Sequence, residues 1–309
     1  MTSQTLITKS ADLSAKSRAG EVVLAYLDGQ ATRLRVLEPE VRAGTPDAVH
    51  QMRVTARRLR AALQVFPALW PAPVTGPLKD DLQWLGRTLG EARDVEVLSG
   101  YLESGLEDLP AELVLGPAKA RVTVQFASRA ATAREGVDEA LDSPRYLALL
   151  AGLSELLAAP PRTAAALAPA GDVLPAGVAR AWQQTRRRMR RAERTAAGPR
   201  RDEALHEARK AARRARYAAE AVTPVYGKKA RRFTKRIKAL ASALGEQHDA
   251  VAARAEARDA GVQAHLAGES AFSFGLLHER ANADARASAD RARHAWHRAA
   301  KPKSVRWLR

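Results

Sequence analysis

Apolar residues recur along this chain three and four positions apart, the spacing of a helix with one buried side. One such run is Leu78, Leu82, Leu85 and Leu89, and another is Met52, Ala56, Leu59, Leu63 and Phe66. No stretch alternates apolar and polar residues between turn residues, as an exposed strand would. The pattern therefore predicts an all-α fold.

The expected helices fall into two halves of about four each. The first half, residues 20–157, contains helices over 21–41, from about 47 to 66, around 78–94, over 117–141 and over 145–157. The second half, residues 178–300, contains helices over 178–197, around His206, over 231–257 and over 272–299. Residues 158–177 are rich in Pro and Ala, so they are predicted to be a linker. Residues 1–19 and 301–309 are predicted to be flexible ends.

A basic motif occurs once in each half. The first copy is His50, Arg53, Arg57, Arg58 and Arg60, and the second is His206, Arg209, Arg213, Arg214 and Arg216. Each residue of the second copy lies 156 positions after its equivalent. The second copy also contains Lys210.

A second motif repeats in the same order. Leu-Gly-Glu-Ala-Arg-Asp ends at Asp94, and Leu-Gly-Glu-Gln-His-Asp ends at Asp249, 155 positions later. Two motifs that recur with nearly the same interval indicate an internal duplication. The sequence therefore predicts a tandem helical bundle.

The helical repeat places the basic residues of each motif on one face. At about 100° per residue, His50, Arg53, Arg57 and Arg60 project on the same side. The opposite side carries Met52, Leu59 and other apolar residues, or mainly alanine in the second copy. Each helix is thus expected to present a row of guanidinium groups while its back is buried.

The charge balance favours a polyanionic partner. The 309 residues include 51 Lys and Arg against 34 Asp and Glu, a formal net charge of +17. Aromatic residues make up 5% and are not interleaved with the basic ones, which argues against stacking on single-stranded bases. The chain has no cysteine, so it has no disulfide, thiolate metal site or cysteine nucleophile. No apolar run is long enough for a membrane span, so a cytoplasmic protein without a membrane partner is expected.

The repeated histidine and arginine motifs, together with the two Leu-Gly-Glu segments, resemble the CHAD family, the conserved histidine α-helical domain. The resemblance implies a single domain over 20–309, in which two pseudo-symmetric four-helix halves enclose a basic central cleft or pore. It also implies binding of inorganic polyphosphate, in some members at polyphosphate granules. By position, the binding residues would be His50, Arg53, Arg57, Arg60, His206, Arg209, Lys210, Arg213 and Arg216, with Lys79, Lys235 and Lys238 on adjoining helices.

Some proteins similar to this family also carry a CYTH domain, a strand-built tunnel with a Glu-x-Glu-x-Lys signature. The nearest segment here, residues 38–42, contains a proline and ends in Arg, and the chain leaves no length for eight strands. A stand-alone binding domain is therefore expected.

Guanidinium groups suit a repeating phosphate ligand because they donate in a planar fork. His50 and His206 lie near helix N-termini and beside arginines, so they are expected to be neutral at pH 7. Glu91, Asp94, Glu246 and Asp249 are expected to hold arginines in position rather than to act as catalysts or metal ligands. No cofactor or metal is expected.

Three functions remain open from the sequence. The first is non-catalytic binding of inorganic polyphosphate in the cytoplasm, including association with polyphosphate granules. The second is a basic helical protein that binds nucleic acid, because a charge of +17 also suits that partner. The third is a metal-dependent phosphohydrolase that uses the histidines and acids.

Overall fold

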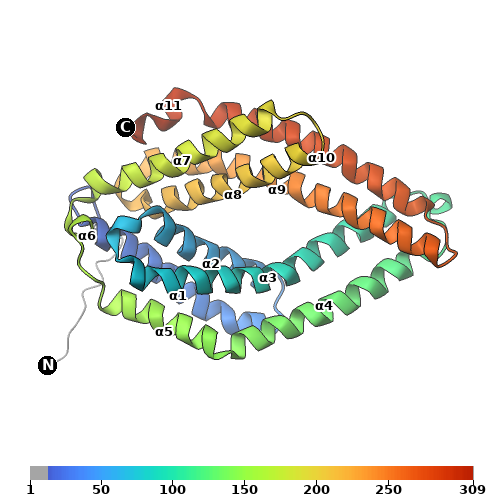
Figure 1. The fold of residues 1–309 in the computed structure, drawn as a ribbon, viewed down its shortest axis with the longest axis horizontal. Helices are drawn as coiled ribbons and strands as arrows, with labels where there is room; N and C mark the ends of the chain where they lie inside the picture. Colours follow the sequence, from blue (N-terminus) through green and yellow to red (C-terminus); the bar gives the residue numbers. More distant parts are fainter. Residues whose placement is uncertain (1–12, 309) are drawn as a thin grey trace.

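The computed structural model describes residues 13–308, which form helices and no strand, so the predicted all-α class is confirmed (Figure 1). The first half of the chain begins with two helices joined by a short loop. The helices of this half are α1 (Ala19–Arg42), α2 (Ala48–Val65), α3 (Ala72–Glu107), α4 (Ala118–Asp142) and α5 (Pro144–Ala158). Short 3₁₀ turns follow α2 at Pro67–Leu69 and α3 at Ala111–Leu113.

The second half repeats the succession of long antiparallel helices. It contains α6 (Ala164–Leu167), α7 (Ala170–Arg194), α8 (Pro199–Ala221), α9 (Thr223–Leu266), α10 (Phe272–Ala299), α11 (Pro302–Val305) and a 3₁₀ turn (Arg306–Leu308). Gly227 interrupts the first turns of α9 with a φ of 48°, which favours glycine. Within residues 13–308, none of these helices combines the length and apolar character that a bilayer crossing requires.

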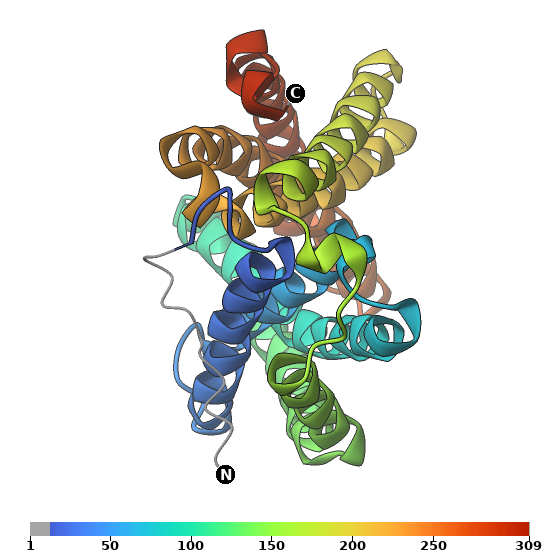
Figure 2. The same cartoon turned by 90° about the vertical axis from the view of Figure 1, so that its left-hand side faces the viewer.

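Each half is built by packing successive helices against one another. α1 contacts α2, α2 contacts α3 and α3 contacts α4, while α7, α8, α9 and α10 pack in the same succession. In Figure 1 the first half lies below the second, and the end-on view of Figure 2 separates the two groups. The halves meet where α2 contacts α8 and where α3 contacts α9. The pseudo-twofold relation between them stays a prediction.

Two separate hydrophobic cores hold the halves together. The larger core includes residues from α1, α2, α3, α5, α7, α8, α9 and α10. The smaller core lies where the distal ends of α3 and α4 meet those of α9 and α10, at the right of Figure 1. It is made of side chains that include Leu102, Leu106, Phe126, Phe274 and Leu277. The halves are therefore joined at two places along the long axis of the molecule.

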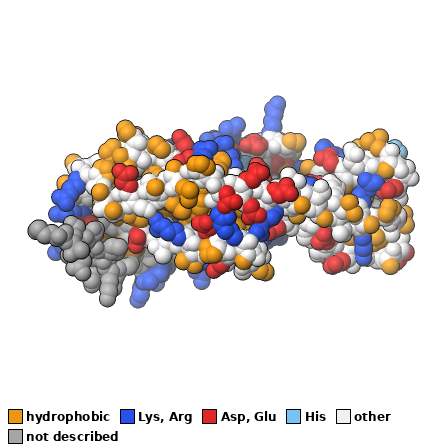
Figure 3. Space-filling view, turned by 90° about the horizontal axis from the view of Figure 1, so that it is seen from below, with side chains coloured by type: hydrophobic (Ala, Val, Ile, Leu, Met, Phe, Trp, Pro, Cys, Tyr) orange, Lys and Arg blue, Asp and Glu red, His pale blue; other side chains and the backbone are white. Residues whose placement is uncertain are grey.

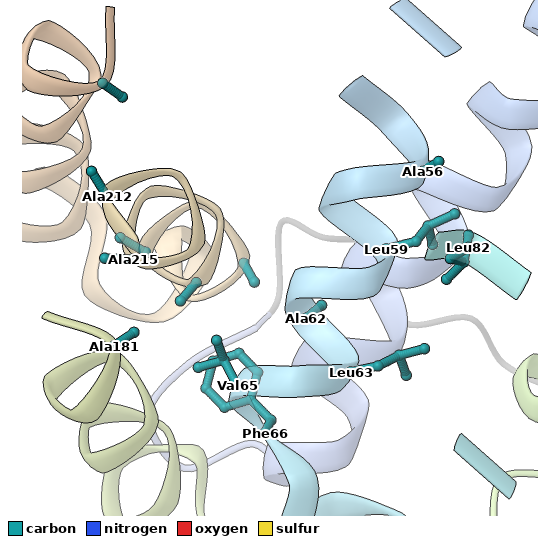
Figure 4. Packing of buried hydrophobic residues seen from close by; sticks show 14 of the residues in the cluster. Ala56, Leu59, Ala62, Leu63, Val65, Phe66, Leu82, Ala181, Ala212 and Ala215 are labelled. Atoms are coloured by element: carbon teal, nitrogen blue, oxygen red, sulfur yellow. The ribbon is translucent and has the colours of Figure 1, made fainter. Parts of the chain in front are cut away.

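Small residues allow α2 to approach α7 and α8 closely. In Figure 4, Val65 and Phe66 lie at the end of α2, on the side nearer to those two helices. A Cβ atom at Gly177 of α7 would lie 2.8 Å from the ring of Phe66, so only glycine fits there without a shift. Buried alanines of α7 and α8 nearby include Ala181, Ala212 and Ala215. This close packing brings the basic face of α8 toward that of α2.

The segment predicted as a linker, 158–177, is partly helical. It contains α6 and the first turns of α7, and Leu174 is fully buried. Pro175 lacks the N–H that would bond to the carbonyl of Gly171 in a regular helix. The hydroxyl of Tyr226 donates to that carbonyl at 3.1 Å instead. A long-range contact therefore supports a helix that the local composition argued against.

The predicted flexible ends are also more ordered than expected where the structure describes them. Ala170 donates from its backbone to the carbonyl of Ser17 at 2.8 Å, which fastens the segment before α1 to the start of α7. Near the other end, the Trp307 ring packs 5.1 Å from Tyr226 and 5.6 Å from Phe233. Residues 1–12 and 309 lie outside the described part of the chain.

The smaller core yields a stability prediction. A Cβ atom at Gly105 of α3 would lie 2.5 Å from the fully buried side chain of Leu277. Gly105→Ala is therefore expected to lower the free energy of unfolding by about 1–3 kcal/mol, measured by urea denaturation. Gly100→Ala, on the same helix with open space around it, should raise it by about 0.5–1 kcal/mol. Equal effects of the two substitutions would show that the contact with Leu277 does not constrain the junction.

Candidate functional site

A cleft of about 430 Å³ lies between the two halves and is lined by α1, α2, α3, α8 and α9. The first half contributes Arg33, His50, Gln51, Arg53, Val54, Thr55, Arg57, Arg58, Arg93, Asp94 and Val97. The second half contributes Arg209, Arg213, Arg216, Tyr217, Lys238, Ala241, Ser242 and Asp249. We call this the central cleft. Nine of its lining residues are Arg or Lys and two are Asp, so it is strongly cationic.

The repeated arginines are brought together in this cleft. Of the residues that the sequence singled out, seven line it: His50, Arg53, Arg57, Arg209, Arg213, Arg216 and Lys238. Six of them come from the two copies of the basic motif, which lie on α2 and α8, and Lys238 comes from α9. The shared concavity expected from the duplication is present.

The Leu-Gly-Glu motif holds the first arginine of each row. Arg53 donates to Asp94 at 3.0 Å, and its guanidinium lies against Gly90, where a Cβ atom would be 3.0 Å from Nη2. In the second half, Arg209 donates to Asp249 at 3.5 Å. Its Nε would be 3.8 Å from a Cβ atom at Gly245. Gly90 thus makes room for the guanidinium of Arg53, whereas a Cβ atom at Gly245 would make only an ordinary contact with Arg209. In both halves the aspartate four residues after the glycine orients the guanidinium.

The other two acids of the motif behave differently from each other. Glu246 accepts from Arg291 of α10 at 2.8 Å, so it also holds an arginine, on the outer side of α9. Glu91 forms no ion pair with any residue of 13–308. The expectation that these acids position arginines therefore applies to three of the four.

Arg57 and Arg213 carry charges deep in the cleft that no neighbouring carboxylate pairs with among residues 13–308. Burial lowers the pKa of Arg57, and both burial and the neighbouring Arg209 and Arg57 lower the pKa of Arg213 to about 9. The Nε groups of Arg53, Arg57 and Arg209 are buried without a hydrogen-bond acceptor. The cleft therefore offers donors and charge that an anion would satisfy.

The lowered pKa of Arg213 means that burying its charge destabilises the folded state at neutral pH. The lowered pKa of Arg213 favours the folded state only in strong alkali, above the ordinary pKa of an arginine, and this benefit is lost as the pH falls through about 9. At pH 7 the guanidinium is charged in both folded and unfolded states, so the folded protein bears the full cost of burying it. A bound anion would offset this cost.

The two repeated histidines have different surroundings. His50 lines the cleft, and burial together with Arg93 lowers its pKa. His206 does not line the cleft, because its Nδ1 lies 3.0 Å from Nδ1 of His248. Burial and nearby cations lower the pKa of His206 too, and that of His248 to about 3. Arg93 and His248 occupy equivalent positions of the repeated motif, so this one difference explains why the histidines diverge.

A carboxylate connects the halves beside the cleft. Glu220 of α8 accepts from Arg58 of α2 at 3.1 Å and from Arg216 of its own helix at 2.7 Å. Both guanidinium groups also lie over the ring of Tyr217, at 5.8 and 5.4 Å from its centroid. Arg216 is therefore partly neutralised, whereas Arg57 and Arg213 are not.

Five predicted binding residues lie outside the central cleft. Arg60 bonds to Gln83 of α3, and Lys210 pairs with Glu207 at 2.7 Å on the side of α8 that faces α7. The others are His206, held by His248, and two lysines on neighbouring helices, Lys79 and Lys235. Helix positions alone placed most of the row on the face that lines the cleft. Arg60 and His206 instead contact side chains of adjacent helices, Gln83 and His248.

The structure adds lining residues that the sequence-based set omitted. Arg58 belongs to the repeated motif, and Arg93 is equivalent to His248, so an alignment of the two motifs could have included both. Tyr217 directly follows the last arginine of the second row. Arg33 of α1 bonds to Gln51, but no repeat marked it.

The exposed side of the first half lacks this concentration of one charge. In the space-filling view of Figure 3, seen from below, Lys and Arg lie among Asp and Glu over the exposed side of the first half. Outer arginines are commonly paired, for example Arg42 with Asp142 at 2.8 Å and Arg145 with Asp81 at 2.7 Å. Among residues 13–308, no three side chains of the metal-binding types form a group that could hold an ion. The arrangement is suited to electrostatic binding of a multivalent anion.

Comparisons with known proteins agree with this architecture. The model of the CHAD domain matches residues 25–258. The uncharacterized proteins MT2285 and Rv2226 of Mycobacterium tuberculosis are each 32% identical over 255 residues. The match covers 81% of this chain and 48% of each relative, so the chain spans about half the length of the curated relatives it matches.

Two solved structures share the fold. PptA from Streptomyces chartreusis is 25% identical with a TM-score of 0.76, and the match covers 91% of this chain and all of that one. The CHAD domain from the plant Ricinus communis is 27% identical with a TM-score of 0.68, and the match covers 92% of this chain and 93% of that one.

The buried charge of the cleft leads to a prediction about stability. Arg213→Met keeps most of the side-chain volume and removes one crowded cation. It is expected to raise the free energy of unfolding of the ligand-free protein at pH 7 by about 1 kcal/mol or more, measured by urea denaturation. The exposed Arg190→Met should change it by less than about 0.5 kcal/mol. A loss of stability in Arg213→Met would mean that Arg213 stabilises the fold through a structural partner, and that its buried charge does not destabilise the protein.

Proposed function

The chain belongs to the CHAD family, and on that premise we propose that it binds inorganic polyphosphate in the central cleft without catalysing a reaction. The observation that carries the proposal is that both arginine rows face one cleft, with Arg57 and Arg213 unneutralised within it. The coarser inference, a role connected with polyphosphate, is supported by the family. The binding residues and the absence of catalysis are our proposal.

The chemistry of the cleft suits a chain of phosphates. Guanidinium groups from opposite sides can donate to successive phosphoryl oxygens, and each contact is strengthened by charge. The aromatic contribution to the lining is Tyr217, whose ring already lies beneath Arg58 and Arg216. The cleft thus supplies charge density and donors without a platform on which a base would stack.

Duplex nucleic acid fits the arrangement less well. Its grooves are about 12 Å and 6 Å wide, and the wider one is read by a projecting element such as an α-helix. Here the cations converge on a concave space of about 430 Å³, while the face of the first half in Figure 3 mixes both signs of charge. This contrast favours a slender polyanion.

The proposal of a non-catalytic role is based on the ion pairs that the two aspartates of the cleft form. Asp94 and Asp249 are each engaged by an arginine, which suits them to positioning rather than to proton transfer. We propose binding at polyphosphate granules in the cytoplasm as the corresponding location. Release of phosphate from polyphosphate on adding magnesium or manganese would contradict the non-catalytic assignment.

Removal of the central charges should abolish most of the binding. Arg57→Ala with Arg213→Ala is expected to weaken long-chain polyphosphate binding by at least about tenfold and to reduce its salt dependence, measured by titration at several salt concentrations. Folding should be little affected, because neither side chain pairs with a carboxylate of residues 13–308. The matched control is Arg190→Ala with Arg194→Ala, which removes two exposed cations from α7.

The same titration separates polyphosphate from nucleic acid. Duplex DNA at equal phosphate concentration should displace labelled polyphosphate poorly. Efficient displacement by duplex DNA would indicate that the ligand is nucleic acid. Unchanged salt dependence in the Arg57 and Arg213 double variant would show that the binding site lies outside the cleft.

Binding should strengthen in mild acid, and one histidine should account for it. The pKa of His50 is lowered in the free protein, and a phosphate in the cleft would raise it, so affinity should increase as the pH falls from about 8 to about 5.5. His50→Asn should flatten this profile. His206→Asn should leave it nearly unchanged, because His206 contacts His248 outside the cleft. A profile that depends equally on both histidines would contradict this assignment.

A further inference from the structure

A second cationic concavity lies on the other side of α8, between α7 and α8. Its volume is about 440 Å³. Arg187, Arg188 and Arg191 of α7 line one wall, and Lys210 and Arg214 of α8 line the other. We call it the α7–α8 groove. It does not share a lining residue with the central cleft.

The charge of this groove is poorly balanced. Its arginines on α7 form no ion pair with a carboxylate of residues 13–308. The acid in the lining is Glu207, which Lys210 already contacts at 2.7 Å. That hydrogen bond lowers the pKa of Glu207, and Arg188 lowers it further. Arg187 and Arg191 lie one turn apart, where like charges repel. The groove therefore has unsatisfied positive charge, as the cleft does.

Cationic side chains connect the groove to the central cleft. Arg214 lines the groove and directly follows Arg213, which lines the cleft. Arg60 of α2 lies one turn beyond Arg57. Burial lowers the pKa of Arg60, and the charge of Arg214 is the second cause of this decrease. Arg60 therefore lies within electrostatic reach of the groove. A polyanion that leaves the cleft along α2 and α8 would meet Arg60 and then Arg214.

We propose that the α7–α8 groove binds the part of a long polyphosphate chain that extends beyond the central cleft. This inference rests on the proposed function and assigns the protein a preference for long chains. A short phosphate chain occupies the cleft alone, whereas a long one contacts both sites at once. The second contact is intramolecular, so it adds affinity without a second binding event.

The test compares two double variants on one helix. Arg187→Ala with Arg191→Ala removes two cations that line the groove, and Arg190→Ala with Arg194→Ala removes two that do not. Both pairs have the same spacing and the same change in charge. Titrations use tripolyphosphate and long-chain polyphosphate with the full-length protein.

The groove variant is expected to bind long-chain polyphosphate roughly tenfold more weakly, with a salt slope lower by about two. Its affinity for tripolyphosphate should be unchanged, and the control variant should resemble the unmodified protein for both ligands. Equal losses in the two variants, or none in either, would overturn the inference while leaving the cleft assignment intact. If the unmodified protein binds neither ligand, or if the Arg57 and Arg213 double variant binds both normally, the proposed function itself fails.

Discussion

Repulsion among partly buried guanidinium groups is the constraint that the rest of this structure accommodates. Burial lowers the pKa of Arg57, Arg209 and Arg213, and nearby arginines lower each pKa further. Charges of one sign avoid such an arrangement unless the surrounding structure imposes it. Helix packing on the far sides of α2 and α8 provides that constraint, since their apolar faces belong to the larger core.

Two structural features counter the repulsion among these arginines. The first is the aspartate of each Leu-Gly-Glu motif, which gives Arg53 and Arg209 a counter-charge, together with Gly90, which leaves space for the guanidinium of Arg53. The second is the double connection between the halves. With the larger core at one end and the smaller core at the other, repulsion within the cleft cannot simply drive α2 and α8 apart. The two hydrophobic cores, which lie away from the cleft, thus stabilise its geometry.

Much of this organisation could be predicted from the sequence, because duplication and helical periodicity are local signals. The all-α class, the two basic helices and their inward arginines follow from residue spacing. The deviations depend on partners that spacing does not reveal. His206 turns to His248, Lys210 faces α7, and Tyr226 supports the helix around Pro175. Each requires knowledge of which helices become neighbours, which the sequence of one helix does not contain.

The cleft is lined by one repeated kind of group, and this has a consequence for movement within the proposed complex. A polyphosphate chain consists of identical units, and the lining arginines recognise a charge rather than a chain end or a base. Shifting the chain by one unit therefore recreates the same set of contacts, so no single register is preferred. The ligand would be held firmly across its width and yet be able to slide along its length.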